Sequence, residues 1–150
     1  MQLATLLCLV IAVTDGDTLK VRCDQQPEPV NLTIRMAEID SPERRQAFGT
    51  RATQALGALC FREQATVKPQ TTDRYSRTVA RVECKGKDAN SDMVRLGMAW
   101  AYTKYQTDAL FPQLELQARS QRVGLWADAE TAVPPVAPWV WRKLPKDQRE

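Results

Sequence analysis

The first three elements that the sequence predicts are strands, with no helical pattern between them. Leu3 to Val13 is an apolar, charge-free stretch whose β-branched end runs into the turn residues Asp15-Gly16. Thr18–Cys23 and Asn31–Met36 each alternate apolar and polar residues, as half-buried strands do. Because the parallel strands of a doubly wound sheet need helices between them, this order argues against that fold.

A helix and two further strands complete the expected order. The apolar residues that recur with helical spacing on one face are Ala52, Ala55, Leu56, Leu59 and Cys60. After them the sequence predicts two strands, one at Ala65–Lys68 that Pro69 stops and one at Thr78–Cys84. Two helices follow. The first is capped near Asn90-Ser91-Asp92 and ended by Gly97, and the second runs from about Pro112 to Val123 and is ended by Gly124. Five short strands with a helix after the third are typical of a small closed barrel such as the OB-fold. We therefore expect an α+β protein, a five-stranded OB-fold β-barrel with three helices.

The chain length of 150 residues suits one domain with a C-terminal extension. After Trp126 the sequence becomes rich in proline, shows no periodicity and carries Trp139 and Trp141. We expect a domain at residues 1–126 and an extended strap at residues 127–150, whose tryptophans dock on the domain.

The four cysteines form no Cys-x-x-Cys pair, which argues against a zinc or thioredoxin-type site. If Asp15-Gly16 is a two-residue hairpin turn, Cys8 faces Cys23 within disulfide reach, although a bulge at the turn would shift this register. Cys60 and Cys84 would then form a second pair. Four buried free thiols are the alternative.

Two disulfides would indicate an oxidising compartment. The apolar stretch within residues 1–14 is too short to span a membrane and lacks the features of a secretory signal. We therefore expect a mature chain, with any signal already removed, in a secreted or periplasmic location.

The absence of histidine constrains the chemistry most strongly. With zero histidines, Ser-His-Asp and Cys-His catalysis and His-ligated zinc are excluded. Any reaction must use carboxylates, Arg or Lys, hydroxyls, thiols or a hard metal. The net charge of +3 is compatible with an anionic partner but does not by itself establish one.

Two predicted turns and one strand carry a matching set of charged residues. Asp17 lies in the first turn, Asp40 and Glu43 lie in a second, and Arg35 comes from the strand that leads to the second turn. Clustered carboxylates suit Ca²⁺ or Mg²⁺, and guanidiniums such as Arg35 and Arg77 can bind a phosphate through two hydrogen bonds. Each motif alone also has a structural interpretation, because Asp-Gly and Ser-Pro-Glu are common turn or helix-start sequences.

Five segments in a compatible order and spacing resemble the thermonuclease (staphylococcal nuclease-like) family. They are Val13–Thr18, Arg35–Glu43, Phe48-Gly49, Asp73–Arg77 and Met93–Trp100. The resemblance covers about Cys8 to Trp126 and implies an OB-fold barrel with three helices. It also implies a Ca²⁺-dependent nuclease that hydrolyses phosphodiester bonds of DNA and RNA and leaves 3′-phosphates. Little sequence specificity is expected, because the implied residues address phosphate rather than base edges.

The resemblance also implies roles for individual residues. Asp17, Asp40 and the backbone carbonyl of Ser41 would bind Ca²⁺. Glu43 would be the general base, while Arg35 and Arg77 would bind the scissile phosphate.

Further matches of the same kind concern substrate binding. Arg74 and Tyr75 match positions that contact a terminal phosphate, and Tyr105 matches a tyrosine beside the base. The expected partners are DNA and RNA, single-stranded or frayed, and we expect a monomer with no membrane attachment and no obligate protein partner.

One departure from the family pattern concerns the turn before Arg77. Ser76 stands where the family often has glycine, and a positive φ at this position would strain the turn that orients Arg77. The alternative function is therefore an OB-fold module that binds nucleic acid without cutting it.

Overall fold

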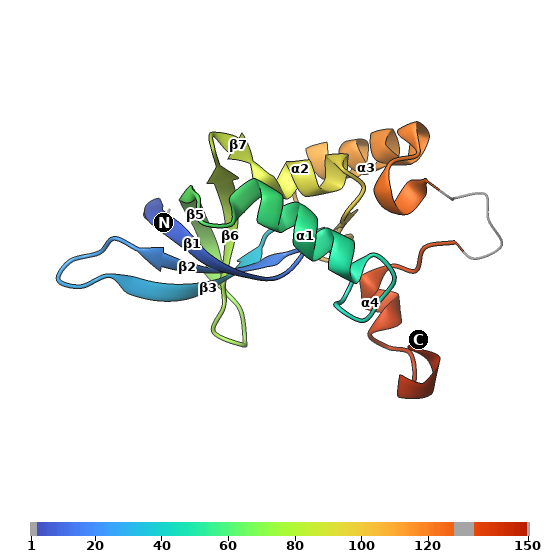
Figure 1. Ribbon diagram of the computed structural model, residues 1–150, viewed down its shortest axis with the longest axis horizontal. Coiled ribbons are helices and arrows are strands. Elements are labelled where there is room, and N and C mark those ends of the chain that lie inside the picture. Colours follow the sequence, from blue (N-terminus) through green and yellow to red (C-terminus); the bar gives the residue numbers. More distant parts are fainter. Residues whose placement is uncertain (1–2, 128–133, 150) are drawn as a thin grey trace.

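The computed structural model describes residues 3–127 and 134–149 and contains a closed five-stranded barrel (Figure 1). The barrel strands are β1 (Leu6–Asp15), β2 (Thr18–Cys23), β3 (Val30–Met36), β5 (Gln64–Thr72) and β6 (Thr78–Cys84). They follow the order β3-β2-β1-β5-β6, and a parallel pairing of β3 with β6 closes the sheet on itself. The predicted α+β class and OB-fold barrel are confirmed.

Three helices lie close to their predicted positions. They are α1 (Gly49–Cys60), α2 (Ala89–Arg95) and α3 (Leu110–Gln121). The carboxylate of Asp88, rather than a residue at 90–92, caps α2 by accepting a hydrogen bond from the backbone N–H of Asn90. Arg122, in the left-handed conformation, ends α3, and Gly124 begins the 3₁₀ turn η1 (Gly124–Trp126).

The prediction that Pro69 stops its strand was wrong. β5 continues to Thr72 and shifts its register against β6 between Pro69 and Thr71. A proline removes one ladder hydrogen bond, and a bulge tolerates that loss. Short strands without a periodic signal were also missed, namely β4 (Ile39–Asp40), its partner β8 (Trp100–Ala101), and β7 (Lys87–Asp88).

The first hairpin turns one residue later than predicted. Asp15 pairs with Thr18, so the two loop residues are Gly16 and Asp17. Two register shifts in β1 then restore the pairing of Cys8 with Cys23. Register shifts of this kind bend and twist a strand, as a small barrel requires.

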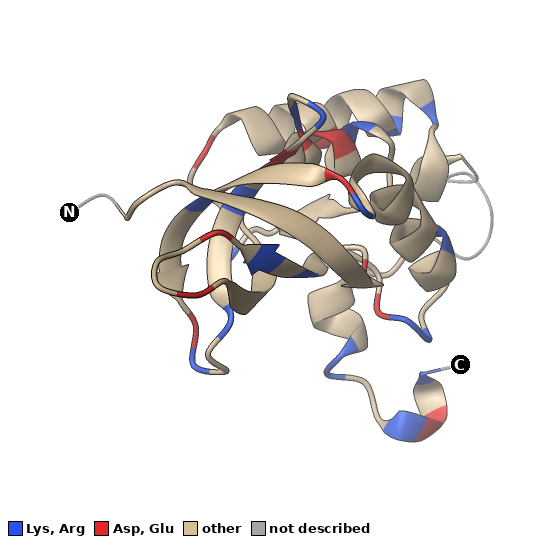
Figure 2. Ribbon diagram, turned by 60° about the vertical axis from the view of Figure 1, so that its left-hand side comes forward, with Lys and Arg blue, Asp and Glu red and all other residues tan. Residues whose placement is uncertain are grey.

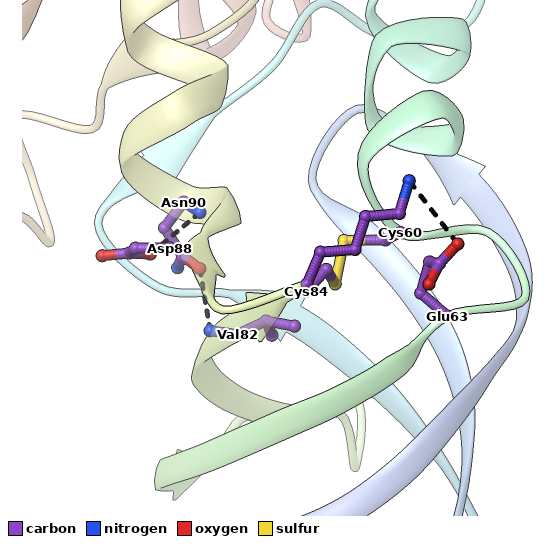
Figure 3. The surroundings of a disulfide bond; sticks show 7 residues. Cys60, Glu63, Val82, Cys84, Asp88 and Asn90 are labelled. Atoms are coloured by element: carbon purple, nitrogen blue, oxygen red, sulfur yellow. Dashed lines mark hydrogen bonds and ion pairs between the residues drawn. A yellow bond between two sulfur atoms is a disulfide. The ribbon is translucent and has the colours of Figure 1, made fainter.

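Both cysteine pairs are disulfide-bonded in the structure. One bond joins Cys8 to Cys23, and the other joins Cys60 at the end of α1 to Cys84 at the end of β6 (Figure 3). Beside the second bond, Lys85 forms an ion pair with Glu63 at 3.5 Å. The second disulfide thus ties α1 to the barrel.

Two apolar clusters organise the interior. The larger one fills the barrel and includes Leu19, Ile34 and Leu56, all fully buried. The smaller one centres on Trp100 and Trp126, whose rings meet edge to face at 5.1 Å. Basic and acidic residues are interspersed over the surface elements (Figure 2).

The C-terminal segment, defined here as residues 134–149, is only partly the extended strap that the sequence predicts. It contains the short helix α4 (Pro138–Trp141) and the 3₁₀ turn η2 (Lys146–Gln148). Proline at the first helical position favours this start. Trp139 docks edge to face on Trp100 at 6.5 Å, whereas Trp141 lies under the guanidinium of Arg149 in the same segment.

The remainder of the predicted extension, residues 128–133, lies outside the described residues. The proposed domain boundary after Trp126 stays a prediction. Within the described residues, no helix has both the length and the apolar character needed to cross a membrane.

Asn90 joins three parts of the fold. Its amide donates to the carbonyls of Ala37 and Ala80 and accepts from the N–H of Val82, and the residue is fully buried. We expect Asn90→Ala to lower the free energy of unfolding by about 3 kcal/mol, because it leaves buried backbone groups unpaired. Urea titration measures this effect. The matched control Asn31→Ala, at an exposed strand position, should change it by less than about 0.5 kcal/mol.

Candidate active site

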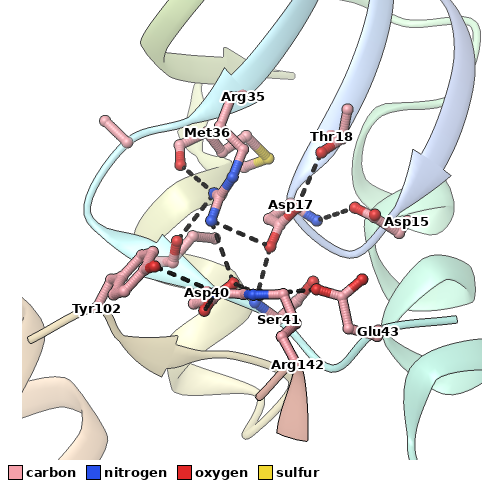
Figure 4. A network of polar contacts seen from close by, with 12 residues as sticks. Asp15, Asp17, Thr18, Arg35, Met36, Asp40, Ser41, Glu43, Tyr102 and Arg142 are labelled. Carbon is pink, nitrogen blue, oxygen red and sulfur yellow. Dashed lines mark hydrogen bonds and ion pairs between the residues drawn. The ribbon is translucent and has the colours of Figure 1, made fainter. Parts of the chain in front are cut away.

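Two loops that are distant in the sequence bring Asp17 and Asp40 together at one end of the barrel (Figure 4). The carboxylate of Asp17 accepts hydrogen bonds from the Ser41 N–H and the Thr18 hydroxyl, both at 2.9 Å. Asp40, at the end of β4, is fully buried. These contacts hold the hairpin turn against the loop that follows β4.

Arg35 lies between the two carboxylates. One guanidinium nitrogen, Nη2, is 3.5 Å from Asp17 Oδ2 and 3.2 Å from Asp40 Oδ1. The other, Nη1, donates to the carbonyls of Met36 and Ile39 at 2.8 and 2.9 Å. A guanidinium held on both sides in this way has a fixed orientation.

Gly16 permits the close approach of these loops. A β-carbon at this position would lie 2.7 Å from both Ala52 Cβ and Ser41 Oγ. Only glycine therefore fits where the hairpin meets α1 and the loop after β4. The Asp-Gly-Asp motif thus serves packing as well as charge.

Sequence reasoning missed Arg142, which reaches the same site from the C-terminal segment. Its guanidinium donates to Asp40 Oδ2 and Glu43 Oε1, each at 2.7 Å. It also contacts Asp40 Oδ1 and the Tyr102 hydroxyl, each at 3.1 Å. No sequence signal marks this residue, because it lies outside every motif and its partners are about 40 to 100 positions away.

The site holds more acidic than basic groups. Four carboxylates, those of Asp15, Asp17, Asp40 and Glu43, stand against the guanidiniums of Arg35 and Arg142. Burial and the charge of Asp17 raise the pKa of Asp15 to about 8, and burial raises that of Asp40 to about 6. Burial alone would also raise the pKa of Asp17, but Arg35 and several hydrogen bonds outweigh it and lower this pKa to about 2.

This donor set fits a hard cation. Carboxylate oxygens are preferred ligands of Ca²⁺, and four acidic side chains face only two guanidiniums here. Among residues 3–127 and 134–149, no group of three or more acidic, cysteine or histidine side chains is placed so that it could hold a metal ion. In the present arrangement, Arg142 contacts both oxygens of Asp40.

The structure does not bring Arg77 into this cluster. Its Nε pairs with Asp73 Oδ2 at 2.8 Å, and its backbone N–H donates to the same carboxylate. None of its contacts within the described part of the chain is with Asp17, Asp40 or Glu43. The ion pair within the turn directs this side chain locally.

The other predicted substrate-binding residues are exposed. The guanidiniums of Arg74 and Arg77 lie over the ring of Tyr75, at 4.9 and 5.5 Å from its centroid. Tyr105 packs edge to face on Tyr102 at 5.0 Å, and Tyr102 stacks on Trp139 at 5.4 Å. Tyr102 therefore links the site to the C-terminal segment.

Ser76 adopts the left-handed conformation, with φ of 64°. We expect Ser76→Gly to raise the free energy of unfolding by about 0.5–1 kcal/mol, because a left-handed backbone strains serine more than it costs glycine in chain entropy. Chemical denaturation measures the change. A decrease in stability would show that the serine side chain stabilises the turn.

An OB-fold barrel that ends in a buried carboxylate pair and a fixed arginine is the architecture that the sequence motifs imply. Comparison with known protein families identifies the same family as the sequence motifs, because residues 33–128 match the staphylococcal nuclease homologue family. The chain belongs to this family, which confirms the resemblance seen in the sequence.

Three similar proteins illustrate the relationship. Protein ParB of Escherichia coli is 40% identical over 94% of this chain and 81% of its own length. A micrococcal nuclease of Shigella flexneri is 39% identical over 92% of this chain and 81% of its own length. The staphylococcal-like nuclease CAN1 of Arabidopsis thaliana is 38% identical over 73% of this chain and 33% of its own length.

Proposed function

We propose that the protein is a Ca²⁺-dependent nuclease that hydrolyses phosphodiester bonds of DNA and RNA with little sequence specificity and leaves 3′-phosphates. The observation that carries the proposal is the position of Arg35 within 3.5 Å of both buried carboxylates, Asp17 and Asp40. Similar proteins named as nucleases support the same activity.

The acidic groups have a natural division of labour in this reaction. Asp17, Asp40 and the Ser41 carbonyl would hold Ca²⁺. Bound Ca²⁺ would supply positive charge that stabilises the negative charge developing on the phosphate. The side chain of Glu43 is 32% exposed and is more accessible than those of Asp17 and Asp40. Glu43 is proposed to orient a water molecule and accept its proton.

Arg35 and Arg77 are proposed to neutralise the charge of the phosphodiester, so that an anionic nucleophile can approach it. Arg35 keeps its charge at any working pH, and its contacts with two backbone carbonyls fix its position. The proposed role of Arg77 requires its side chain to leave Asp73. Because the ion pair is partly exposed, a phosphate can replace Asp73 at modest cost in free energy.

The Asp73–Arg77 turn and Tyr105 form the proposed substrate-binding surface. Exposed aromatic rings such as those of Tyr75 and Tyr105 can stack on bases of any identity, which suits single-stranded or frayed DNA and RNA. We also propose that the protein acts as a monomer without an obligate protein partner. The two disulfides support a secreted or periplasmic location.

We expect Ca²⁺ to permit degradation of single-stranded DNA and chelation to stop it. A fluorescent oligonucleotide incubated with millimolar Ca²⁺, with and without excess chelator, and resolved by electrophoresis tests this directly. An intact oligonucleotide at saturating Ca²⁺ that still binds the protein would favour the non-catalytic OB-fold binding module.

We expect Glu43→Gln to lower kcat by about 10²–10⁴-fold, because it removes the proton acceptor. Affinity for a nucleotide diphosphate, measured by calorimetry with Ca²⁺ present, should change by less than about threefold, because binding depends on the arginines and the metal. Glu28→Gln, at an exposed loop position, is the charge-matched control and should leave both quantities unchanged. Loss of nucleotide binding in Glu43→Gln would contradict this division of roles.

A further inference from the structure

The C-terminal segment contacts the acidic site or its neighbouring residues at three places. The side-chain amide of Gln46, three residues after Glu43, donates to the carbonyl of Val136. Trp139 stacks on Tyr102 with the rings 7° from parallel. Arg142 follows one helical turn later and enters the carboxylate cluster (Figure 4).

Arg142 contacts the carboxylates whose oxygens the proposed chemistry requires. Its guanidinium pairs with both oxygens of Asp40, a proposed metal ligand, and with Glu43, the proposed base. A guanidinium has only hydrogen-bond donors, so in this position it compensates carboxylate charge but cannot coordinate a metal or accept a proton. While these contacts persist, Asp40 and Glu43 are occupied by the chain itself.

We propose that the C-terminal segment is an inhibitory latch, in which Arg142 closes the acidic site and Ca²⁺ competes with it for Asp40. The latch rests on the proposed function, since it regulates the same site. Binding of Ca²⁺ displaces Arg142 and thereby also frees Glu43.

The geometry of the segment makes such displacement feasible. The side chains of Arg142 and Glu43 are 36% and 32% exposed, so solvent screens their ion pair, whereas the Asp40 side chain is 1% exposed and its pair with Arg142 is open to solvent only on the Arg142 side. Val136 and Val140 are exposed, and Pro138 is the only buried residue of α4. The apolar packing of the segment on the domain involves Ala137 and Trp139, so opening has to break these few contacts.

Calorimetric titration of the full chain with Ca²⁺ alone tests the competition. If the closed state outnumbers the open state by about ten to one, Arg142→Gln should bind Ca²⁺ about tenfold more tightly than the unmodified protein. The control Lys143→Gln removes the same charge at the neighbouring exposed position, and its Ca²⁺ affinity should stay within about twofold of that of the unmodified protein. Arg142→Lys keeps the charge but loses the paired hydrogen bonds of the guanidinium, so its Ca²⁺ affinity should lie between those of Arg142→Gln and the unmodified protein. This variant replaces Arg142→Gln if Arg142→Gln does not fold.

Hydrogen exchange provides a readout that does not depend on activity. In the unmodified protein, Ca²⁺ should accelerate exchange of the backbone amides at residues 140–144 by about tenfold. In Arg142→Gln, exchange there should already be fast without Ca²⁺. Unchanged or slower exchange on adding Ca²⁺ would overturn the latch.

The outcomes separate the latch from the proposed function. Equal Ca²⁺ affinity in Arg142→Gln and the unmodified protein overturns the latch and leaves the nuclease proposal standing. Absence of Ca²⁺ binding in both proteins overturns the nuclease proposal and the latch with it. In DNA cleavage, the latch predicts a lower Ca²⁺ midpoint for Arg142→Gln with kcat at saturating Ca²⁺ unchanged. A fall in that kcat would instead assign Arg142 a role in the transition state and overturn the latch.

Discussion

The guanidinium of Arg35, held between Asp17 and Asp40, is the interaction on which the site depends. Two buried carboxylates near each other would repel each other and resist ionisation. Arg35 offsets that repulsion and also satisfies the carbonyls of Met36 and Ile39, so one side chain fixes β3, the hairpin turn and β4 relative to each other. The site is therefore built into the closure of the barrel rather than attached to its surface.

Arg35 does not complete the charge balance, and this has consequences for the rest of the site. The side chains of Asp15, Asp17, Asp40 and Glu43 face only two guanidiniums, and burial raises the pKa of Asp15 and of Asp40. Arg142 supplies a second positive charge, and it comes from a segment whose only buried residue in α4 is Pro138. A cluster with this imbalance attracts any available cation, whether a guanidinium of the same chain or a divalent ion, and the proposed regulation follows from this competition.

The Asp73–Arg77 turn, part of the proposed substrate-binding surface, makes none of its side-chain ion pairs with the acidic cluster within the described residues. The Asp73–Arg77 turn is organised by the Asp73 carboxylate, which accepts from the backbone N–H groups of Tyr75 and Arg77 and pairs with the Arg77 side chain. Ser76 in this turn is left-handed, a conformation to which serine is less suited than glycine. A phosphate that draws Arg77 from Asp73 would join the two regions.

The sequence by itself predicted the barrel strands, the three main helices and the family, because these depend on local periodicity, turn residues and motifs, and it offered the pairing of Cys8 with Cys23 as one of two alternatives. It could not determine where the hairpin turns, since two compensating register shifts in β1 leave the cysteine pairing unchanged while moving the turn by one residue. It also gave no sign that β5 passes through Pro69 or that Arg77 is held by Asp73. Above all, only the tertiary structure places Arg142 on Asp40 and Glu43, because a contact across about 100 residues arises from how the chain folds back and leaves no local pattern.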